Sequence, residues 1–492
     1  MLRPKFVAFV AATAVYRVCF HPLSVFPGPK RFAITAVPQK WENHINGTWV
    51  RRVRGLHRQY GPIVRIGPDH LSIDGSIAWP QIYSHQAGKA EFGKLPGHFG
   101  IHNDKLLVGA PRDTHRRQRR HLGHAFSETA LTEQQGIMLH YVGLLLDKLS
   151  ENARQGKKVN LVNWFNFMAF DIIGDLTFGE PFGSLTRNDY HPWIRTLLEG
   201  IRGGAMARFT LFYPILTPIF PILVGRKFLR SKKESDELSE TKADARIAQG
   251  EIDGRRDFMT YMTRKNRDGE YGMTHEEQVI NAPLLIGAGS ETTASALSGF
   301  FFLMGKREDL VQLLTEEVRN AFETEKEITS KSAARLPYLS ACLSEAMRLY
   351  PPAVETPPRV SPGAVVEGKF VPEGTLLSVY QLSTYRNPDH FADSEEFHPE
   401  RWLPATHPLY NPKYAGDNRD VFKPFSFGPR DCVGKNLARA EMTVVASRIL
   451  HRFEWELEPG QEDWIERQRI FLIWEKPPLW VRFRHREETR AN

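Results

Sequence analysis

The stretch Phe425-Ser426-Phe427-Gly428-Pro429-Arg430-Asp431-Cys432-Val433-Gly434 decides the fold of this 492-residue chain. Gly428 and Gly434 allow the backbone to turn tightly and to approach a flat partner closely. A helical pattern over residues 435–450 follows directly. It places the sulfur of Cys432 beside a helix N-terminus, where free N–H groups and the helix dipole favour a thiolate.

The chain has only three cysteines, Cys19, Cys342 and Cys432, and they lie far apart. They make no disulfide framework, so we expect the catalytic body in a reducing compartment. A lone cysteine is usually an inert buried side chain, and this interpretation holds for Cys342 in the core and Cys19 in the N-terminal segment. Near Cys432, Arg430 offers a forked cation suited to a carboxylate, and Phe425 can shield the sulfur from water.

The spacing F-x-x-G-x-R-x-C-x-G is satisfied at every fixed position of this loop, and the sequence closely resembles the cytochrome P450 family. The resemblance implies that Cys432 is the axial thiolate ligand of heme b, with O2 as cosubstrate. It also implies that Arg430 meets a haem propionate and that Phe425 and Gly434 border the cofactor. A thiolate ligand donates electron density to iron and favours O–O cleavage, and backbone N–H bonds to the sulfur tune this donation.

A second motif, residues 288–293 (Ala-Gly-Ser-Glu-Thr-Thr), lies inside a long apolar helical pattern over about residues 276–304. Ala288 and Thr292 are four residues apart and share one helix face, where small side chains leave room for dioxygen. The Thr292 hydroxyl can bond back to a carbonyl and open the helix locally. Taken alone, the string is equally typical of a capping box or a polar helix face. It matches the A/G-G-x-D/E-T pattern of the family, which implies Thr292 as proton relay and Glu291 as supporting acid.

Glu345 and Arg348 lie three residues apart on one predicted helix face, and Arg401 follows in a Pro-Glu-Arg-Trp string. Such pairs on a surface contribute little to stability. The resemblance implies that the three form a buried structural triad that fixes the segment before the cysteine loop.

Two further arginines match haem-binding positions of the family. Arg119 corresponds to the arginine of a W-x-x-x-R motif, but the tryptophan position is His115 in this chain. This departure puts the second propionate contact in doubt, although His115 can still donate a hydrogen bond. Arg359, after two prolines, resembles another propionate-binding arginine.

Helical patterns dominate between about residues 134 and 348, and strand patterns lie near residues 63–73, 354–379 and 469–483. We therefore predict a mainly α fold with a minor β portion (α+β), as in the cytochrome P450 fold. No internal repeat is visible, so residues 27–492 are predicted to form a single haem-thiolate catalytic domain.

Residues 6–15 are apolar, which is shorter than the roughly 20 residues of a full membrane span. We expect residues 1–26 to form an uncleaved N-terminal membrane anchor and hinge, ending at Pro27-Gly28-Pro29. A short helix packed on the protein is the alternative. The anchor predicts an endoplasmic reticulum membrane location, with the catalytic domain facing the cytosol.

The formal net charge is +8 at pH 7. Neither zinc-finger spacing nor an RNA-binding signature accompanies it, so a nucleic-acid partner is not expected. The sequence contains no flavin or dinucleotide fingerprint, so electrons must come from a separate protein. NADPH-cytochrome P450 reductase is the expected donor, with cytochrome b5 as a second candidate, and the enzyme is expected to be a monomer. A basic face is predicted for this docking, with an ordinary solvated face as the alternative; its members are Arg116, Arg117, Arg120, Lys423, Lys435 and Arg439.

The predicted activity is insertion of one oxygen atom into a hydrophobic small molecule. The strings around residues 20–23 and 26–30 resemble fungal microsomal members of secondary-metabolite pathways, which leaves terpenoid, polyketide and alkaloid substrates open. Two alternatives are a haem-thiolate isomerase or peroxygenase and a non-enzymatic haem binder. The Glu291-Thr292 pair argues against both.

Overall fold

The central element of the fold is α14 (His275–Gly305), which packs along α8 (Leu161–Phe178). The computed structural model describes residues 2–100, 104–219, 221–222, 225–250, 252, 255–264 and 272–486. Helix α14 begins at a capping box in which Thr274 and Glu277 satisfy each other's backbone N–H groups. A Cβ atom on Gly289 would lie 2.7 Å from the Ile173 side chain, so this glycine allows the two helices to approach closely.

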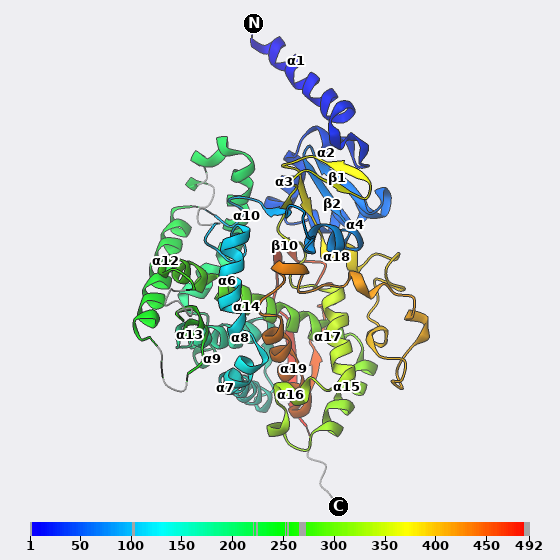
Figure 1. Cartoon of the computed structure of the whole chain (residues 1–492). Helices are drawn as coiled ribbons and strands as arrows, with labels where there is room; N and C mark the ends of the chain where they lie inside the picture. Colours follow the sequence, from blue (N-terminus) through cyan, green and yellow to red (C-terminus); the bar gives the residue numbers. More distant parts are fainter. Residues whose placement is uncertain are drawn as a thin grey trace, which may run out of the picture.

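Most of the remaining long helices surround this pair and form the larger, helical part of the molecule (Figure 1). They are α6 (Arg112–Ala125), α7 (Glu128–Arg154), α10 (Pro192–Phe212), α12 (Arg226–Ala248), α15 (Glu308–Ala321), α17 (Pro337–Leu349) and α19 (Lys435–Arg452), while α4 (Trp49–Tyr60) packs against β1 and α18. Shorter helices are α2 (Lys30–Ile34), α3 (Val37–Trp41), α5 (Gly75–Ala78), α9 (Ser184–Arg187), α13 (Phe258–Met262), α16 (Ser330–Ala333) and α18 (Gln381–Tyr385). Single turns are η1 (Tyr16–Phe20), η2 (Pro22–Val25), η3 (Glu42–Asn46), η4 (Trp79–Tyr83), η5 (Pro214–Ile219), η6 (Glu325–Glu327), η7 (Pro399–Trp402), η8 (Pro412–Tyr414), η9 (Arg419–Val421) and η10 (Gly428–Arg430).

Small sheets make up the minor part. The largest has five strands in the order β1-β2-β8-β5-β3, and only the β2–β8 pair is parallel. Its strands are β1 (Ile63–Gly67), β2 (His70–Ile73), β3 (Gly93–Lys94), β5 (Arg359–Val360) and β8 (Leu376–Ser378). The other sheets pair β4 (Lys158–Asn160), β12 (Trp480–His485) and β9 (Phe453–Leu457), then β10 (Arg469–Phe471) with β11 (Ile473–Glu475), and β6 (Ala364–Val366) with β7 (Lys369–Val371).

This architecture confirms the predicted fold class, because helices dominate and the sheets are small. The oxygen-motif helix, predicted over about residues 276–304, extends from 275 to 305. Strands occur in all three predicted regions. The strands β3, β4 and β9 lie outside these regions and were not predicted, because such short runs beside turns and long helices carry too little pattern to register.

The N-terminal helix α1 (Leu2–Val15) projects from the body of the molecule (Figure 1). Its apolar side chains are exposed, with Phe6 at 68% and Phe9 at 69%. Among the helices of the described residues, none combines the length and the apolar character needed to cross a membrane. The anchor predicted over residues 1–26 therefore stays a prediction.

Candidate active site

The cysteine loop is a tight turn that fits against residues 79–83. Gly428 has a φ of +78°, and a Cβ atom there would lie 2.0 Å from the carbonyl oxygen of Tyr83, so only glycine fits. The backbone N–H of Cys432 donates to the Phe425 carbonyl at 2.8 Å and closes the loop. Gly434 has an ordinary φ of −87°, so the backbone does not require glycine at this position.

Cys432 has the properties expected of a ligand to a bound group. Its side chain keeps accessible surface although the surrounding protein desolvates it. Burial raises the pKa of the Cys432 thiol, and the N–H of Gly434 and the charge of Arg119 oppose this rise only in part. Helix α19 begins at Lys435, as predicted. A thiol with a raised pKa becomes a thiolate when a metal ion displaces its proton.

The oxygen motif lies on α14, and α14 packs against α19. Ala288 is exposed although most of its helix is buried, and Thr292, one turn later, is partly exposed. The Thr292 hydroxyl donates to the Ala288 carbonyl at 2.6 Å. The two residues therefore share one accessible face, and the predicted bond back to a carbonyl is present.

Glu291 points away from this face. Its carboxylate is buried in an ion pair with Lys476, which precedes β12, and Lys476 also donates to Ser295 at 2.8 Å. The side chains of Glu291 and Lys476 are only 4% and 3% exposed. The second carboxylate oxygen of Glu291 is buried without a hydrogen-bond partner among the described residues. Proton transfer from Glu291 to Thr292 would therefore require the carboxylate to leave Lys476.

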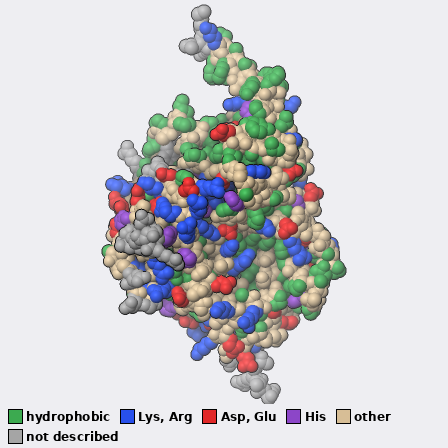
Figure 2. Space-filling view, viewed as in Figure 1, with side chains coloured by type: hydrophobic (Ala, Val, Ile, Leu, Met, Phe, Trp, Pro, Cys, Tyr) green, Lys and Arg blue, Asp and Glu red, His purple; other side chains and the backbone are tan. Residues whose placement is uncertain are grey.

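A cavity of about 980 Å³ brings together four of the predicted haem-binding side chains. Figure 2 shows Lys and Arg side chains gathered on the molecular surface over α6, the helix that supplies several arginines to the lining of this cavity. The cavity is lined by Tyr83, Glu91, Arg112, His115, Arg116, Arg119, Arg120, Arg359 and Arg430, among others.

The charges around this cavity are strongly unbalanced. Burial, together with Arg430, Arg119, Lys94 and Arg359, lowers the pKa of His115 to about 3. His115 is therefore a neutral hydrogen-bonding group at neutral pH. Four cations acting on one imidazole create a site that favours anions.

Few acids balance these cations. Glu91 pairs with Arg430 at 2.5 Å and lies 3.8 Å from Arg359. The Nε atom of Arg359 is buried and has no partner in the described part of the chain. Arg119 is bound twice to Asp431, at 2.6 and 2.8 Å. A carboxylate can therefore bind Arg359 directly, whereas Arg119 and Arg430 would first have to loosen their pairs with Asp431 and Glu91.

These residues fit an iron porphyrin. Cys432 offers an accessible sulfur, Ala288 and Thr292 leave space on the α14 side, and the cavity cations suit two propionates. The orphan Nε of Arg359 is a donor that such a carboxylate would satisfy.

Comparison with known proteins agrees with this geometry. The family model of cytochrome P450 matches residues 27–482. The chain belongs to the cytochrome P450 family. This P450 is 38% identical over 479 residues to the cytochrome P450 monooxygenase astJ of Aspergillus oryzae, covering 96% of this chain and 94% of the relative. It is 39% identical to the monooxygenase aclL of the same species, with 97% and 96% covered. Averantin hydroxylase of Dothistroma septosporum is 37% identical, with 96% and 88% covered.

The structural triad of this P450 is fully buried, and all three side chains are 0% exposed. Arg348 binds both carboxylate oxygens of Glu345, at 2.8 and 2.7 Å, and the Nε atom of Arg401 donates to Glu345 at 3.1 Å. Asp417 adds an ion pair to Arg401. The triad therefore ties α17 to the segment before the cysteine loop, as the resemblance implied.

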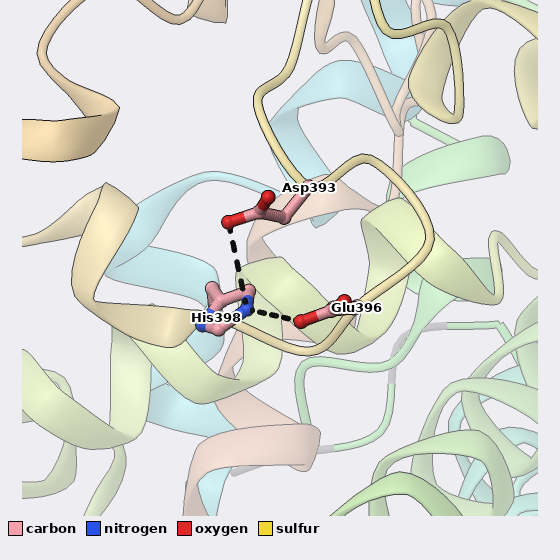
Figure 3. A group of neighbouring side chains, drawn as sticks. All are labelled: Asp393, Glu396 and His398. Atoms are coloured by element: carbon pink, nitrogen blue, oxygen red, sulfur yellow. Dashed lines mark hydrogen bonds and ion pairs between the residues drawn. The ribbon is translucent and has the colours of Figure 1, made fainter.

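A group with metal-ligating side chains lies close to this triad (Figure 3). Asp393, Glu396 and His398 come from one loop and point toward one another. One nitrogen of His398 is 3.0 Å from Glu396 and the other is 3.0 Å from Glu400. Lys413 pairs with Asp393 at 2.5 Å. These partners already satisfy the group, so we interpret it as ion-pair support for the loop.

Sequence reasoning missed three charged residues of this site: Glu91, Lys94 and Lys476. Each becomes relevant only when distant segments meet, as when β3 pairs with β5 and places Lys94 opposite Arg359. A lone lysine carries no local signal for such a role. The only hint in the sequence is that Glu91 and Lys94 place two charges within four residues at β3.

Proposed function

We propose that this P450 inserts one atom of O2 into an apolar small molecule of a fungal secondary-metabolite pathway. The proposal is carried by an accessible Cys432 sulfur just before α19 together with the open Ala288–Thr292 face of α14, a helix that packs against α19. The names of the relatives support the reaction type, and one of them is named for the hydroxylation of averantin. Terpenoid, polyketide and alkaloid intermediates are all within this class.

In this proposal the Cys432 thiolate would ligate the iron of heme b, and the group would supply dioxygen activation when bound. Arg359 and Arg430 would hold its propionates, and neutral His115 would donate a hydrogen bond beside them. The N–H of Gly434 bonds to the sulfur and moderates its electron donation. Phe425 packs under Arg439 at 5.1 Å and limits water near the loop.

Thr292 is the proposed proton relay. In the structure its hydroxyl proton is held by the Ala288 carbonyl, so the hydroxyl oxygen is free to accept a bond from a water or an acid. Glu291 is the proposed source of the proton that Thr292 passes on, and its carboxylate leaves Lys476 for this transfer.

Replacement of Thr292 by Ala tests the reaction. We expect Thr292→Ala to keep its haem but to lose at least about tenfold in product formed per reduced nicotinamide consumed, because the positioned proton donor is gone. The missing reducing equivalents should appear as hydrogen peroxide. The matched control is Thr293→Ala, because Thr293 bonds the Gly289 carbonyl at 2.9 Å on another face of α14. Unchanged coupling in Thr292→Ala would contradict the relay.

Electrons are proposed to come from NADPH-cytochrome P450 reductase, or from cytochrome b5, docking on the basic face. Arg112, Arg116 and Arg120 are exposed on α6. Arg117 does not belong to this face as predicted, because it binds Glu277 through two hydrogen bonds of 2.6 and 2.8 Å. Lys435 is likewise engaged by Asp431 at 2.8 Å. Arg116 keeps only a solvent-exposed ion pair with Asp113 at 3.1 Å, so the charges most available for docking are those of Arg112, Arg116 and Arg120 on α6.

Reduction by the reductase is expected to slow as salt rises, because charge attraction between exposed groups is screened. The double variant Arg116→Glu and Arg120→Glu should reduce the rate by roughly tenfold or more at low salt and remove most of the salt dependence. Lys331→Glu, an equal charge change on α16, is the control. Stopped-flow reduction measures all three proteins. A rate independent of ionic strength would exclude electrostatic docking.

We further propose that the enzyme is bound to the endoplasmic reticulum membrane as a monomer, with its catalytic domain in the cytosol. The exposed apolar side chains of α1 and of Ile215 and Ile222 support this location. Flotation of the full chain with liposomes, compared with a variant lacking residues 1–20, tests it.

A further inference from the structure

Six polar side chains come together where four distant segments meet; four of them are buried, and Arg208 and Glu355 are partly exposed. The titratable members act on one another electrostatically: Lys40, Arg208 and His98 all lower the pKa of His44, and Arg208 and Lys40 both lower that of Glu355. Gln39 adjoins Lys40 in α3. The segments are α3 and η3, the loop after β3, the end of α10, and the stretch before β5. We call the following residues the buried polar cluster: Gln39, Lys40, His44, His98, Arg208 and Glu355.

Two members of the cluster lack the hydrogen bonds that buried polar groups normally make. Gln39 is 0% exposed and His98 is 7% exposed. Neither amide atom of Gln39 and neither ring nitrogen of His98 has a partner within the described residues. Such groups are costly to bury, so their presence together points to a ligand that satisfies them.

The two cations share one acid. In the described part of the chain, neither Lys40 nor Arg208 forms a close ion pair, and Glu355 is the carboxylate that acts on both. Lys40 Nζ lies 3.7 Å above the Phe212 ring and 3.5 Å from His70. Two cations against one acid leave positive charge without a close counter-ion, and a purely structural role does not explain this excess.

The net charge of the cluster is positive at neutral pH. Burial lowers the pKa of Lys40 to about 8, so most of this lysine is charged. Burial also raises the pKa of Glu355 to about 7, so this acid is only partly ionised. Arg208 stays a cation, while burial and neighbouring cations lower the pKa of His98 to about 3 and keep it neutral.

The cluster lies within reach of the haem-binding cavity. Glu355 and Arg359 are four residues apart, so at most about 14 Å of chain separates the cluster from this cavity-lining arginine. Helix α10 also approaches α14. A Cβ atom on Gly287, the residue before Ala288, would lie 3.6 Å from the Leu197 side chain. Helix α10 continues from there to Arg208, which is about 16 Å at 1.5 Å per residue. Helix α10 therefore connects the cluster to the part of α14 that carries Ala288.

We propose that the buried polar cluster binds a carboxylate group of the substrate, so that this P450 acts on an apolar molecule with a free acid. Arg208 and Lys40 hold the carboxylate, and His98 and Gln39 bond a neighbouring hydroxyl or amide. This inference rests on the proposed monooxygenase function. A planar guanidinium matches a carboxylate, and two cations against one partly ionised acid suit a single negative charge. An amine would meet two cations and is excluded.

Binding of matched acids and methyl esters tests this proposal. The probes are dodecanoic acid, 2-naphthoic acid and N-dodecanoylglycine, each with its methyl ester, measured on the haem-loaded enzyme by calorimetry and by the change in haem absorbance. We expect the best-binding acid to bind about 10- to 100-fold more tightly than its ester, the effect of hydrogen bonds to a charged group. Equal or tighter binding of the ester in every pair would overturn the proposal.

The variants Arg208→Gln and Lys40→Met should each reduce the acid–ester difference, and together they should abolish it. Arg195→Gln is the matched control, because Arg195 lies on the same helix in an exposed ion pair with Asp189. Thermal unfolding separates binding from structure: Arg208→Gln should not lower the melting temperature, since the residue removed is a partly desolvated cation that forms no close ion pair among the described residues. A lower melting temperature with an unchanged acid–ester difference would show a structural role and overturn the proposal.

Affinity for the acids should fall as pH rises from 6 to 9. Glu355 gains negative charge near pH 7 and Lys40 loses positive charge near pH 8, and both changes repel a carboxylate. The nearby His44, His70 and His98 stay neutral throughout, because burial lowers each pKa. The other charges that act on the cluster are Arg208, Lys94 and Asp69. Glu355→Gln should remove the part of this fall in affinity that occurs near pH 7. An affinity for the acids that rises with pH would contradict the carboxylate site.

The acid–ester comparison and the spectrum of the ferrous carbonyl form together separate the carboxylate site from the proposed monooxygenase function. A normal ferrous carbonyl band with no preference for acids overturns only the carboxylate site. A missing thiolate-type band in the wild-type protein overturns the haem-thiolate assignment instead, whatever the probes bind.

Discussion

Cys432→Ala is expected to abolish both the thiolate-type absorption band of the ferrous carbonyl form and all monooxygenase activity. The sulfur of Cys432 is the accessible one at the site, and its loop is closed by a backbone hydrogen bond that does not depend on the side chain. The variant should therefore fold, since only one small side chain is lost from an accessible position. Absorption spectroscopy after reduction under carbon monoxide measures the effect.

Cys19→Ala is the matched control, because Cys19 is also exposed but lies in the N-terminal segment. It should keep the band and the activity. The third cysteine, Cys342, is 0% exposed inside α17, so a bound group cannot reach its sulfur and it cannot replace Cys432 as a ligand. A thiolate-type band that survives in folded Cys432→Ala would end the haem-thiolate interpretation.

Glu345→Gln is expected to lower the free energy of unfolding by about 3–5 kcal/mol, since it leaves two buried arginines without their shared carboxylate. The reason is geometric: Arg348 and Arg401 both bind Glu345, and all three side chains are inaccessible to solvent. Because the triad supports the segment before the cysteine loop, the variant should also lose haem more readily. Chemical denaturation followed by fluorescence and by haem absorbance measures both effects.

The pH dependence of this contribution follows from the same contacts. Burial alone would raise the pKa of Glu345, but Arg348 and Arg401 outweigh it and hold the pKa below the usual range. A lowered pKa stabilises the folded state above the unfolded value near 4.5, and this stability is lost as the pH falls through the folded pKa. The stability difference between wild type and Glu345→Gln should therefore shrink in acid.

Glu316→Gln is the control for this prediction, because Glu316 is exposed on α15 and interacts only with Gln312 across one helical turn. Its free energy of unfolding should change by less than about 0.5 kcal/mol. If Glu345→Gln were as mild, the triad would not hold the loop in place.

The parts of the site that could be predicted are those with a fixed local spacing. The cysteine loop, the Ala288–Thr292 turn and the Glu345–Arg348 pair each lie within a few residues, and helix or turn geometry alone sets their arrangement. Arg401 was placed only through the family resemblance. Its contact with Glu345, 56 residues away in sequence, depends on tertiary packing.

The parts that could not be predicted depend on which charges meet in space. The sequence shows Glu291 as an acid beside Thr292 but not that Lys476, 185 residues later, holds it. Likewise, Lys40, Arg208 and Glu355 belong to segments that carry no shared pattern. Their electrostatic coupling arises only after α10 packs on η3, which is a contact between residues more than 150 positions apart.

Tyr83 connects the two halves of the cofactor site. Its carbonyl oxygen lies where a side chain on Gly428 would be, its hydroxyl bonds Thr356 at 2.5 Å, and its ring lies 4.7 Å from the Arg359 guanidinium. A shift of this single residue would disturb the turn that carries Cys432 and the position of the Arg359 guanidinium at the same time. Two walls of the site, far apart in the sequence, are therefore mechanically coupled through one tyrosine.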